Sequence, residues 1–248
     1  MKWAGHRQST GDWGTGIWWP GSRLPGRRLE LLLCLLAVVS LAGLAWKLRQ
    51  LGLATQILLV DLEVLLPAGL SVAAAGLLAD DPARELLLSS ARPARHTLAE
   101  RLAYLWILGA LLGILIVTLA SASGVPLPAE GTERLFIWLP PLVFFTSAAS
   151  TAALARGRAL DGIFVALILV GGGFLAHPFT RMLCAYIPAD AVCAAGLANP
   201  FLTLSNSADL FWPTNRLLWL GMGLGLFWVG QRLAGREEAL LPGSQVEN

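Results

Sequence analysis

The side chains that could do chemistry are few and widely separated. Asp61 and Glu63 stand two residues apart in a long apolar stretch, and His177 follows much later in the chain. Residues two apart on an α-helix point to different faces, so the two carboxylates do not converge for acid–base chemistry. No histidine or cysteine cluster has metal-ligand spacing, and no glycine-rich loop ends in Gly-Lys-Ser/Thr. We expect no catalytic residue, metal site or bound cofactor on this chain.

The two acids still need an explanation, because a carboxylate at mid-bilayer costs about 3 kcal/mol. Either Asp61 and Glu63 line a pathway or gate, or they form an interfacial pair tied to Lys47 or Arg49. His177 has the same two interpretations, a pathway residue or a structural histidine at a helix end.

Composition identifies a multi-pass membrane protein. Apolar residues make up 56% of the chain and charged residues 14%, and the mean hydropathy is +0.65. Soluble domains are about half apolar and a quarter charged. A net charge of +2 is too small to argue for nucleic-acid binding.

The apolar stretches predict an all-α membrane protein with six transmembrane helices and no strand. A segment with Gly, Pro and Trp at 1–28 is expected at the membrane interface, and 235–248 is a polar tail. The transmembrane domain is expected to cover 29–234. Its spans are placed at about 29–45, between 49 and 80, at 102–121 and 135–154, from Asp161 onward, and at 216–233. The alternative for the first span is a cleavable secretory signal.

Glycine and proline modify these spans. Pro67 predicts a kink in the second span, and 171–173 with His177-Pro178 predict a break in the outer part of the fifth. The segment 180–215 would then be partly re-entrant. Close helix packing is expected at Gly109-x-x-x-Gly113, at Gly221-x-x-x-Gly225 and along the small residues 147–153. If Cys184 and Cys193 face an oxidising compartment, they are a candidate disulfide.

The basic residues predict the orientation. With odd-numbered spans going outward, thirteen Lys and Arg lie inside and five outside. By the positive-inside rule both termini and the polar stretch 80–101 are cytoplasmic, and we expect a plasma (bacterial inner) membrane location.

The stretch 80–101 predicts a short cytoplasmic helix between spans 2 and 3. Asp81 can act as its N-cap, Pro82 suits the first helical position, and Glu85 falls in the first turns. Pro93 should end the helix, with the next helix starting near Thr97. The apolar ridge Leu86, Leu87 and Leu88, followed by Ser89, could dock on a partner. The alternative is an ordinary loop with one helical turn.

This arrangement resembles the type 2 ABC-transporter permease family. The resemblance covers most of 29–241 and is carried by six spans, cytoplasmic termini and a Glu-Leu-Leu-Leu-Ser segment at 85–89. Further matching residues are Asn199-Pro200-Phe201, Asp209, Trp212, Asn215-Arg216 and the ending at 238–241. The chain departs from the family at its amino end, where glycine and proline replace an amphipathic helix.

The resemblance implies a function. The helix at 81–90 would be a coupling helix seated in a groove of a separate cytoplasmic ABC ATPase subunit, present in two copies, which would bind ATP and Mg. Asp81, Glu85, Leu86, Leu87, Leu88 and Ser89 would make this contact. A second permease subunit, identical or related, would complete an exporter.

Two other classes remain. A membrane-embedded enzyme would use Asp61, Glu63 or His177, but no nucleophile–base or metal pattern accompanies them. A structural or regulatory membrane protein would bind a partner through the same loop and transport nothing.

Overall fold

The computed structural model describes residues 43, 53–79, 94–127, 131–186, 199–201 and 212–235. Every element in these ranges is helical, with no strand, so the all-α prediction is confirmed for this part of the chain. The elements are α2 (Ala54–Val60), η2 (Asp61–Leu65), α3 (Leu66–Ala79), α5 (Ala94–Ala122), η3 (Gly131–Arg134), α6 (Leu135–Arg156), α7 (Ala159–Tyr186) and α10 (Trp212–Ala234).

Five described helices are long and apolar enough to cross a membrane. They correspond to the second to sixth predicted spans, and they cover Ala54–Leu77, Ala94–Ala122, Gly131–Arg156, Ala159–Ala176 and Trp212–Ala234. The first predicted span lies outside the described residues except for Gly43, which is helical. A sixth span and the side on which the termini lie therefore remain predictions.

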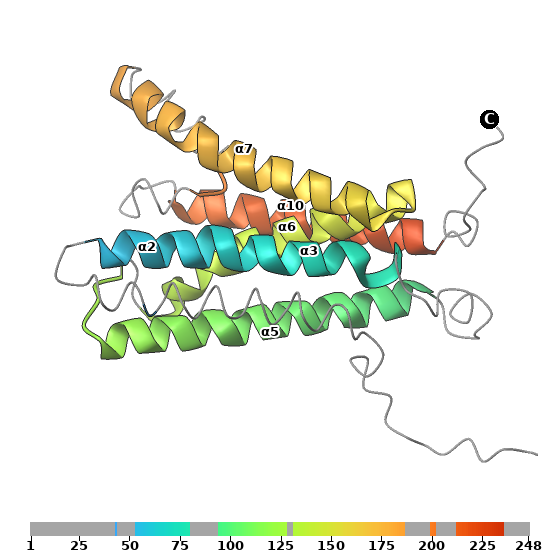
Figure 1. Ribbon diagram of the computed structural model, residues 1–248, viewed down its shortest axis with the longest axis horizontal. Coiled ribbons are helices and arrows are strands. Elements are labelled where there is room, and N and C mark those ends of the chain that lie inside the picture. The colour runs from blue at the N-terminus through green and yellow to red at the C-terminus, as the bar shows by residue number, and fades with distance from the viewer. Residues whose placement is uncertain are drawn as a thin grey trace, which may run out of the picture.

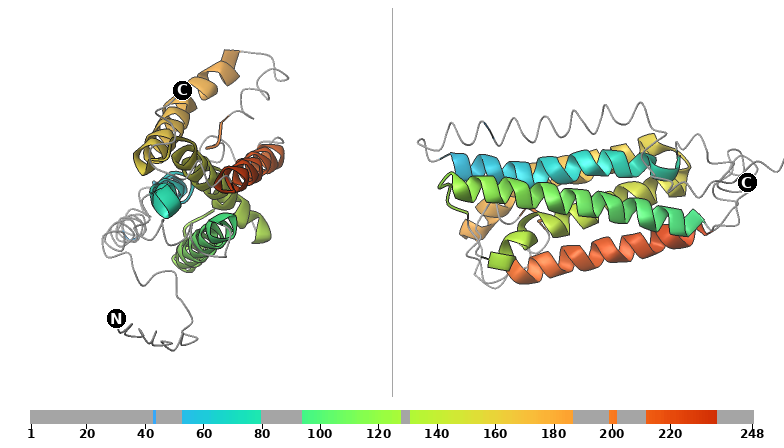
Figure 2. Two further views of the ribbon diagram at one scale, coloured as in Figure 1. Left: turned by 90° about the vertical axis from the view of Figure 1, so that its right-hand side faces the viewer. Right: turned by 90° about the horizontal axis from the view of Figure 1, so that it is seen from below.

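The helices run side by side along the long axis, and successive ones run in opposite directions (Figures 1 and 2). α6 is the central helix. In an 18-residue stretch of its span 78% of the residues are buried, against 22% for the corresponding stretch in α7 and 17% for that in α10. The large apolar side chains exposed on the outer helices include Leu111, Phe164 and Leu167. In a bilayer such faces contact lipid, which is as apolar as they are.

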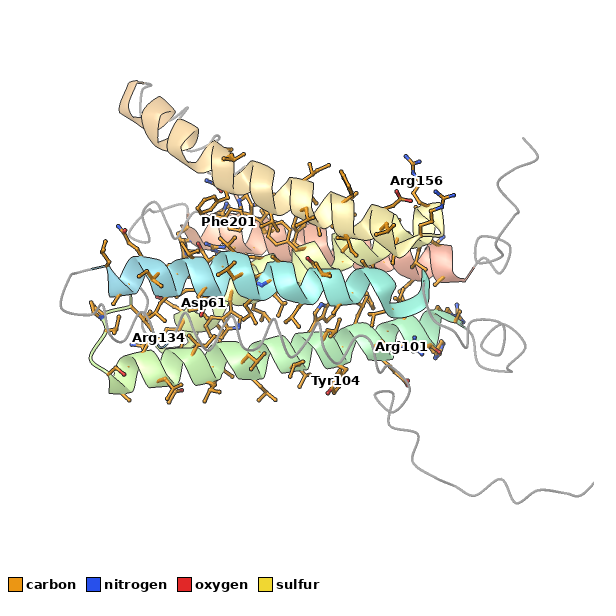
Figure 3. The ribbon with its side chains drawn as sticks, viewed as in Figure 1. Asp61, Arg101, Tyr104, Arg134, Arg156 and Phe201 are labelled. Atoms are coloured by element: carbon orange, nitrogen blue, oxygen red, sulfur yellow. The ribbon has the colours of Figure 1, made fainter. Side chains whose placement is uncertain are left out.

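Charge separates the two ends of the bundle. The basic end is where α3, α6 and α10 finish and α5 and α7 begin; its arginines are Arg95, Arg101, Arg156, Arg158 and Arg232. Figure 3 shows Arg101 and Arg156 at this end and Arg134 at the opposite one. Glu100 and Asp161 are the acids near the basic end in the described ranges.

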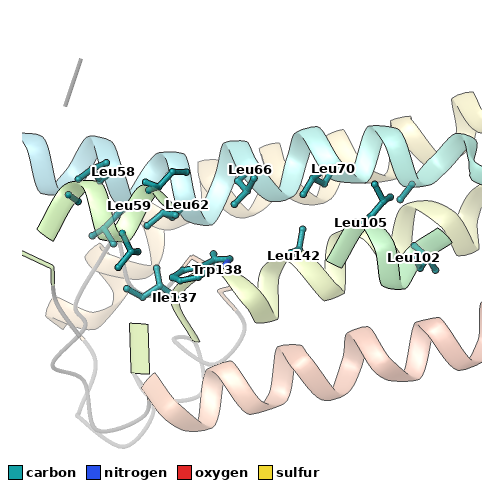
Figure 4. Packing of buried hydrophobic residues seen from close by; sticks show 14 of the residues in the cluster. Leu58, Leu59, Leu62, Leu66, Leu70, Leu102, Leu105, Ile137, Trp138 and Leu142 are labelled. Carbon is teal, nitrogen blue, oxygen red and sulfur yellow. The ribbon is translucent and has the colours of Figure 1, made fainter. Parts of the chain in front are cut away.

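The core packs the second span against α5 and α6. Leu58, Leu62, Leu66 and Leu70 recur every fourth residue, so they share one helix face, and each is at most 2% exposed. Opposite them lie Leu102 and Leu105 of α5 with Ile137, Trp138 and Leu142 of α6 (Figure 4). α6 ends at Gly157, whose φ of 68° is the left-handed conformation that glycine adopts without strain.

The first glycine motif packs as predicted. A Cβ on Gly113 would lie 2.3 Å from the Trp138 indole, and one on Gly109 would lie 2.5 Å from Leu142. The small residues of α6 are also in close contact, since a Cβ on Gly162 of α7 would lie 2.3 Å from the Ala149 carbonyl oxygen.

The prediction for the second glycine motif is wrong. Among the described residues a Cβ on Gly221 or Gly225 would meet nothing within 4 Å, whereas one on Gly223 would lie 2.8 Å from the Phe144 backbone nitrogen. The reason is helical geometry, because a residue two positions away points to nearly the opposite face. Gly223 therefore makes the close approach between α10 and α6.

The predicted break in the fifth span is also wrong. α7 is helical from Ala159 through the glycines at 171–173 and Pro178 to Tyr186. Inside a bilayer an open helix would leave backbone groups without hydrogen bonds, which outweighs the weak helix propensity of glycine. Gly173 instead gives room to a neighbouring turn, since its Cβ would lie 2.8 Å from the Phe201 ring.

Pro67 is accommodated by a π-helical turn. A proline at 67 has no N–H for the Glu63 carbonyl, and its ring clashes with that carbonyl in a regular α-helix. The π-helical turn η2 lies immediately before it, with the Leu66 N–H donating to the Asp61 carbonyl. α2 and α3 continue nearly in line on either side of η2 (Figure 1), so the predicted kink of the second span is not seen.

Candidate functional site

A buried ion pair joins the second span to α10. Arg216 donates through Nη2 to Glu63 Oε1, and both side chains are completely buried. The two residues are 153 positions apart in sequence. The partner that the structure shows for Glu63 is thus Arg216, from the start of α10, whereas Lys47 and Arg49, the suggested partners of the acids, lie outside the described residues.

Arg216 also binds the turn at residues 199–201, which comes before α10 in the sequence. Arg216 Nη1 donates to the Pro200 carbonyl at 2.9 Å. Asn215 Nδ2 donates to the Asn199 carbonyl at 2.9 Å, and the Phe201 N–H donates to Asn199 Oδ1 at 2.9 Å. We call Glu63, Asn199, Pro200, Asn215 and Arg216 the polar cluster. Its hydrogen bonds tie residues 199–201 to α10, and the Arg216–Glu63 pair links α10 to the second span.

Aromatic side chains enclose the polar cluster. Phe201 stacks on Phe145 of α6 with ring centroids 5.7 Å apart, and the guanidinium carbon of Arg216 lies 5.7 Å from the centre of the Trp212 ring. Phe144 packs edge-on against Trp219 at 4.5 Å. This apolar surround excludes water, so the charges of the pair interact more strongly than exposed charges would.

Glu63 lies in a part of the second span that is buried on all sides. Asp61, Leu62 and Glu63 are all 0% exposed, and Val64 is 7% exposed. At this level the second span is covered on every side, which is why residues pointing to different faces are all buried. The prediction that the two acids do not converge agrees with this, because only Glu63 reaches Arg216.

Asp61 is buried differently from Glu63. Neither of its carboxylate oxygens has a hydrogen-bond partner within the part of the chain that the structure describes. Figure 3 shows the residue inside the bundle, between the second span and its neighbours. A buried polar group without a partner costs about 1–3 kcal/mol, so we expect the Asp61 carboxylate to lower the stability of the bundle.

We expect Asp61→Asn to raise the free energy of unfolding by about 1–2 kcal/mol, because the amide has the same shape and no charge to desolvate. Thermal unfolding of the purified protein in detergent would measure this. Ser147→Ala is the control, because it removes another buried oxygen that has no partner in the described residues. It shows how much stability is gained when a neutral buried oxygen is removed. A loss of stability in Asp61→Asn would show that the carboxylate is held by contacts outside the described ranges.

A second arginine links the end of α3 to the start of α5 at the basic end. Arg101 Nη1 donates to the Leu77 carbonyl near the end of α3. A cation at the carboxyl end of a helix is favourable because of the helix dipole. α5 begins at Ala94, directly after Pro93 and three residues before the predicted start. The chain therefore leaves α3 and enters α5 at adjacent points.

Several predicted site residues lie outside the described residues. These are Asp81, Glu85, Leu86, Leu87, Leu88, Ser89 and Cys193, together with the side chains of His177 and Cys184. The helical backbone of α7 includes positions 177 and 184. The coupling contact and the disulfide therefore remain predictions.

The pairing of Arg216 with Glu63 was not predicted from the sequence, where Arg216 is one of the residues of the family resemblance and a basic residue at the start of the last span. One signal could have found it. A single arginine four residues inside an apolar helix is costly unless an acid neutralises it, and the second span carries acids at a comparable depth from the same end.

Comparison of the chain with protein-family models, with curated proteins and with solved structures finds no match.

Proposed function

We propose that this chain is the membrane-spanning permease subunit of an ATP-driven ABC exporter. ATP hydrolysis would take place on a separate cytoplasmic subunit, in two copies, and a second permease subunit would complete the pathway. The proposal rests on the sequence resemblance and on one structural observation. α3 and η2 form a continuous helix that leads from residue 79, next to the predicted coupling segment, to Glu63 of the polar cluster.

That helix offers a mechanical connection. Residues 80–93 connect α3 to α5, and the Arg101–Leu77 contact joins the end of α3 to the start of α5. α3 continues into η2, which carries Glu63, and Glu63 binds Arg216 of α10. A displacement imposed on the loop by a partner would therefore reach α10 and residues 199–201 at the opposite end.

The π-helical turn suits this role. A π turn holds one extra residue, and such turns occur mostly at functional positions. η2 lies between the loop base and the ion pair, where a change of helical register would move Glu63 relative to α10. Few other charged groups lie within the described spans, which fits an apolar or amphipathic cargo better than a strongly charged one.

The direct test is Leu87→Asp in the full-length protein. A docked leucine contributes about 1–3 kcal/mol, so the affinity for the ATPase subunit should fall about 5- to 150-fold. Co-purification of a nucleotide-hydrolysing subunit, and coupled transport in vesicles, are the measurements. Leu87→Met keeps an apolar side chain and is the matched control.

Protein abundance in the membrane should be the same for both variants, because position 87 is predicted to lie outside the spans. Unchanged coupled transport in Leu87→Asp would contradict the proposal. So would labelling of a cysteine at position 87 by a membrane-impermeant reagent in intact cells, because the loop would then lie on the outer side.

A further inference from the structure

A pocket of about 320 Å³ lies at the basic end, between the start of α5 and the end of α10. It is lined by Arg95, Trp228, Gln231, Arg232 and Gly235. None of these residues belongs to the polar cluster, and the pocket lies at the opposite end of the bundle from that cluster.

The electrostatics of the pocket favour an anion. Arg95 and Arg232 are both exposed and line it from different helices. Arg95 is in the first turn of α5, where the helix dipole adds partial positive charge. The carboxyl end of α10 contributes the opposite partial charge, which Arg232 in its last turn offsets. Glu100, one turn further along α5, does not line the pocket.

A phosphate in the pocket would find cationic donors on both walls. Guanidinium groups bind phosphate oxygens through charge-assisted hydrogen bonds, and Arg95 and Arg232 line the pocket from α5 and α10. The lining therefore fits an anionic, phosphate-bearing ligand.

The surroundings indicate that the phosphate belongs to a lipid. The Arg232 guanidinium carbon lies 4.2 Å from the centre of the Trp228 ring, and Trp228 is 57% exposed. Leu224, one turn away on the same face, is 47% exposed. An apolar strip therefore continues from the pocket along α10 toward the membrane interior, where acyl chains would lie. Tryptophan is enriched at this boundary.

We propose that this pocket binds the phosphate of an anionic phospholipid, whose acyl chains pack along Leu224 and Trp228. The inference does not depend on the transport function. It needs only that α5 and α10 span a membrane.

Native mass spectrometry of the full-length protein in detergent, with phosphatidylglycerol or phosphatidylcholine added, tests it. The first phosphatidylglycerol should bind about 25-fold more tightly than phosphatidylcholine, since each of the two arginines near an anionic lipid contributes about fivefold. Arg95→Gln/Arg232→Gln should reduce this preference to within about twofold, and Arg95→Lys/Arg232→Lys should retain most of it.

The matched control is Arg156→Gln/Arg158→Gln, which removes two charges at the same end but outside the pocket and should keep the preference. The proposal is overturned if the Arg95/Arg232 glutamine variant keeps its preference, or if both glutamine variants lose it equally. Inorganic phosphate at constant ionic strength should not displace the lipid. Displacement at equal affinity would assign the pocket to a soluble phosphate compound and also overturn the proposal.

Discussion

Replacing Arg216 with Met should lower the free energy of unfolding by about 3–5 kcal/mol, because Glu63 would remain buried without its cation. Glu63→Leu should cost a similar amount for the converse reason. The measurement is reversible unfolding of the purified protein in mixed detergent micelles, followed by circular dichroism. Arg134→Met is the matched control; its side chain donates to Ser121 in an exposed position, so the expected loss is below about 1 kcal/mol.

The double variant Glu63→Leu/Arg216→Met separates charge pairing from packing. A buried ion pair replaced on both sides by apolar residues is often neutral in stability, since the desolvation cost of both charges disappears as well. We expect the double variant to be more stable than either single variant. Additive losses would contradict the pairing of these two residues, because independent sites add and coupled ones do not.

The hydrogen bonds of the polar cluster sharpen this expectation. Arg216→Met also frees the Pro200 carbonyl, whereas Glu63→Leu leaves that contact in place. The arginine variant should therefore be the less stable of the two, by about 1 kcal/mol for one buried hydrogen bond. If the proposed permease function is correct, both variants should also lose transport, because the connection between η2 and α10 is cut.

Gly223→Ala should destabilise the bundle by about 1–3 kcal/mol, because an added methyl group overpacks a close helix contact. A Cβ at this position would lie 2.8 Å from the Phe144 backbone nitrogen and 2.9 Å from its Cα. Backbone atoms cannot rotate away as a side chain can, so α10 and α6 would have to separate. Unfolding in detergent is again the measurement.

Gly221→Ala and Gly225→Ala are matched controls on the same helix, since a Cβ at either position meets nothing within 4 Å in the part of the chain that the structure describes. Alanine favours a helix over glycine by about 1 kcal/mol, so these variants should be unchanged or slightly more stable. If Gly225→Ala were as destabilising as Gly223→Ala, the assignment of the packing face of α10 would be wrong.

Hydropathy determined the number and position of the described spans. A run of about twenty apolar residues can satisfy its backbone in lipid only as a helix, so the assignment needs no knowledge of neighbours. For the same reason the second to sixth spans were predicted well. The close packing at Gly109 and Gly113 was predicted as well, from their spacing of four residues. The sequence alone also placed Asp61 and Glu63 within a span, where their cost marks them as exceptional.

Which groups meet was decided only by the tertiary structure. Glu63 and Arg216 come from helices far apart in sequence, and their pairing depends on how those helices lie against α6. The same dependence explains the two errors over glycine. A spacing motif states that two glycines share a face, but not whether another helix covers that face. Likewise, glycines weaken an isolated helix, yet α7 stays helical where apolar surroundings leave its backbone no other hydrogen-bond partners.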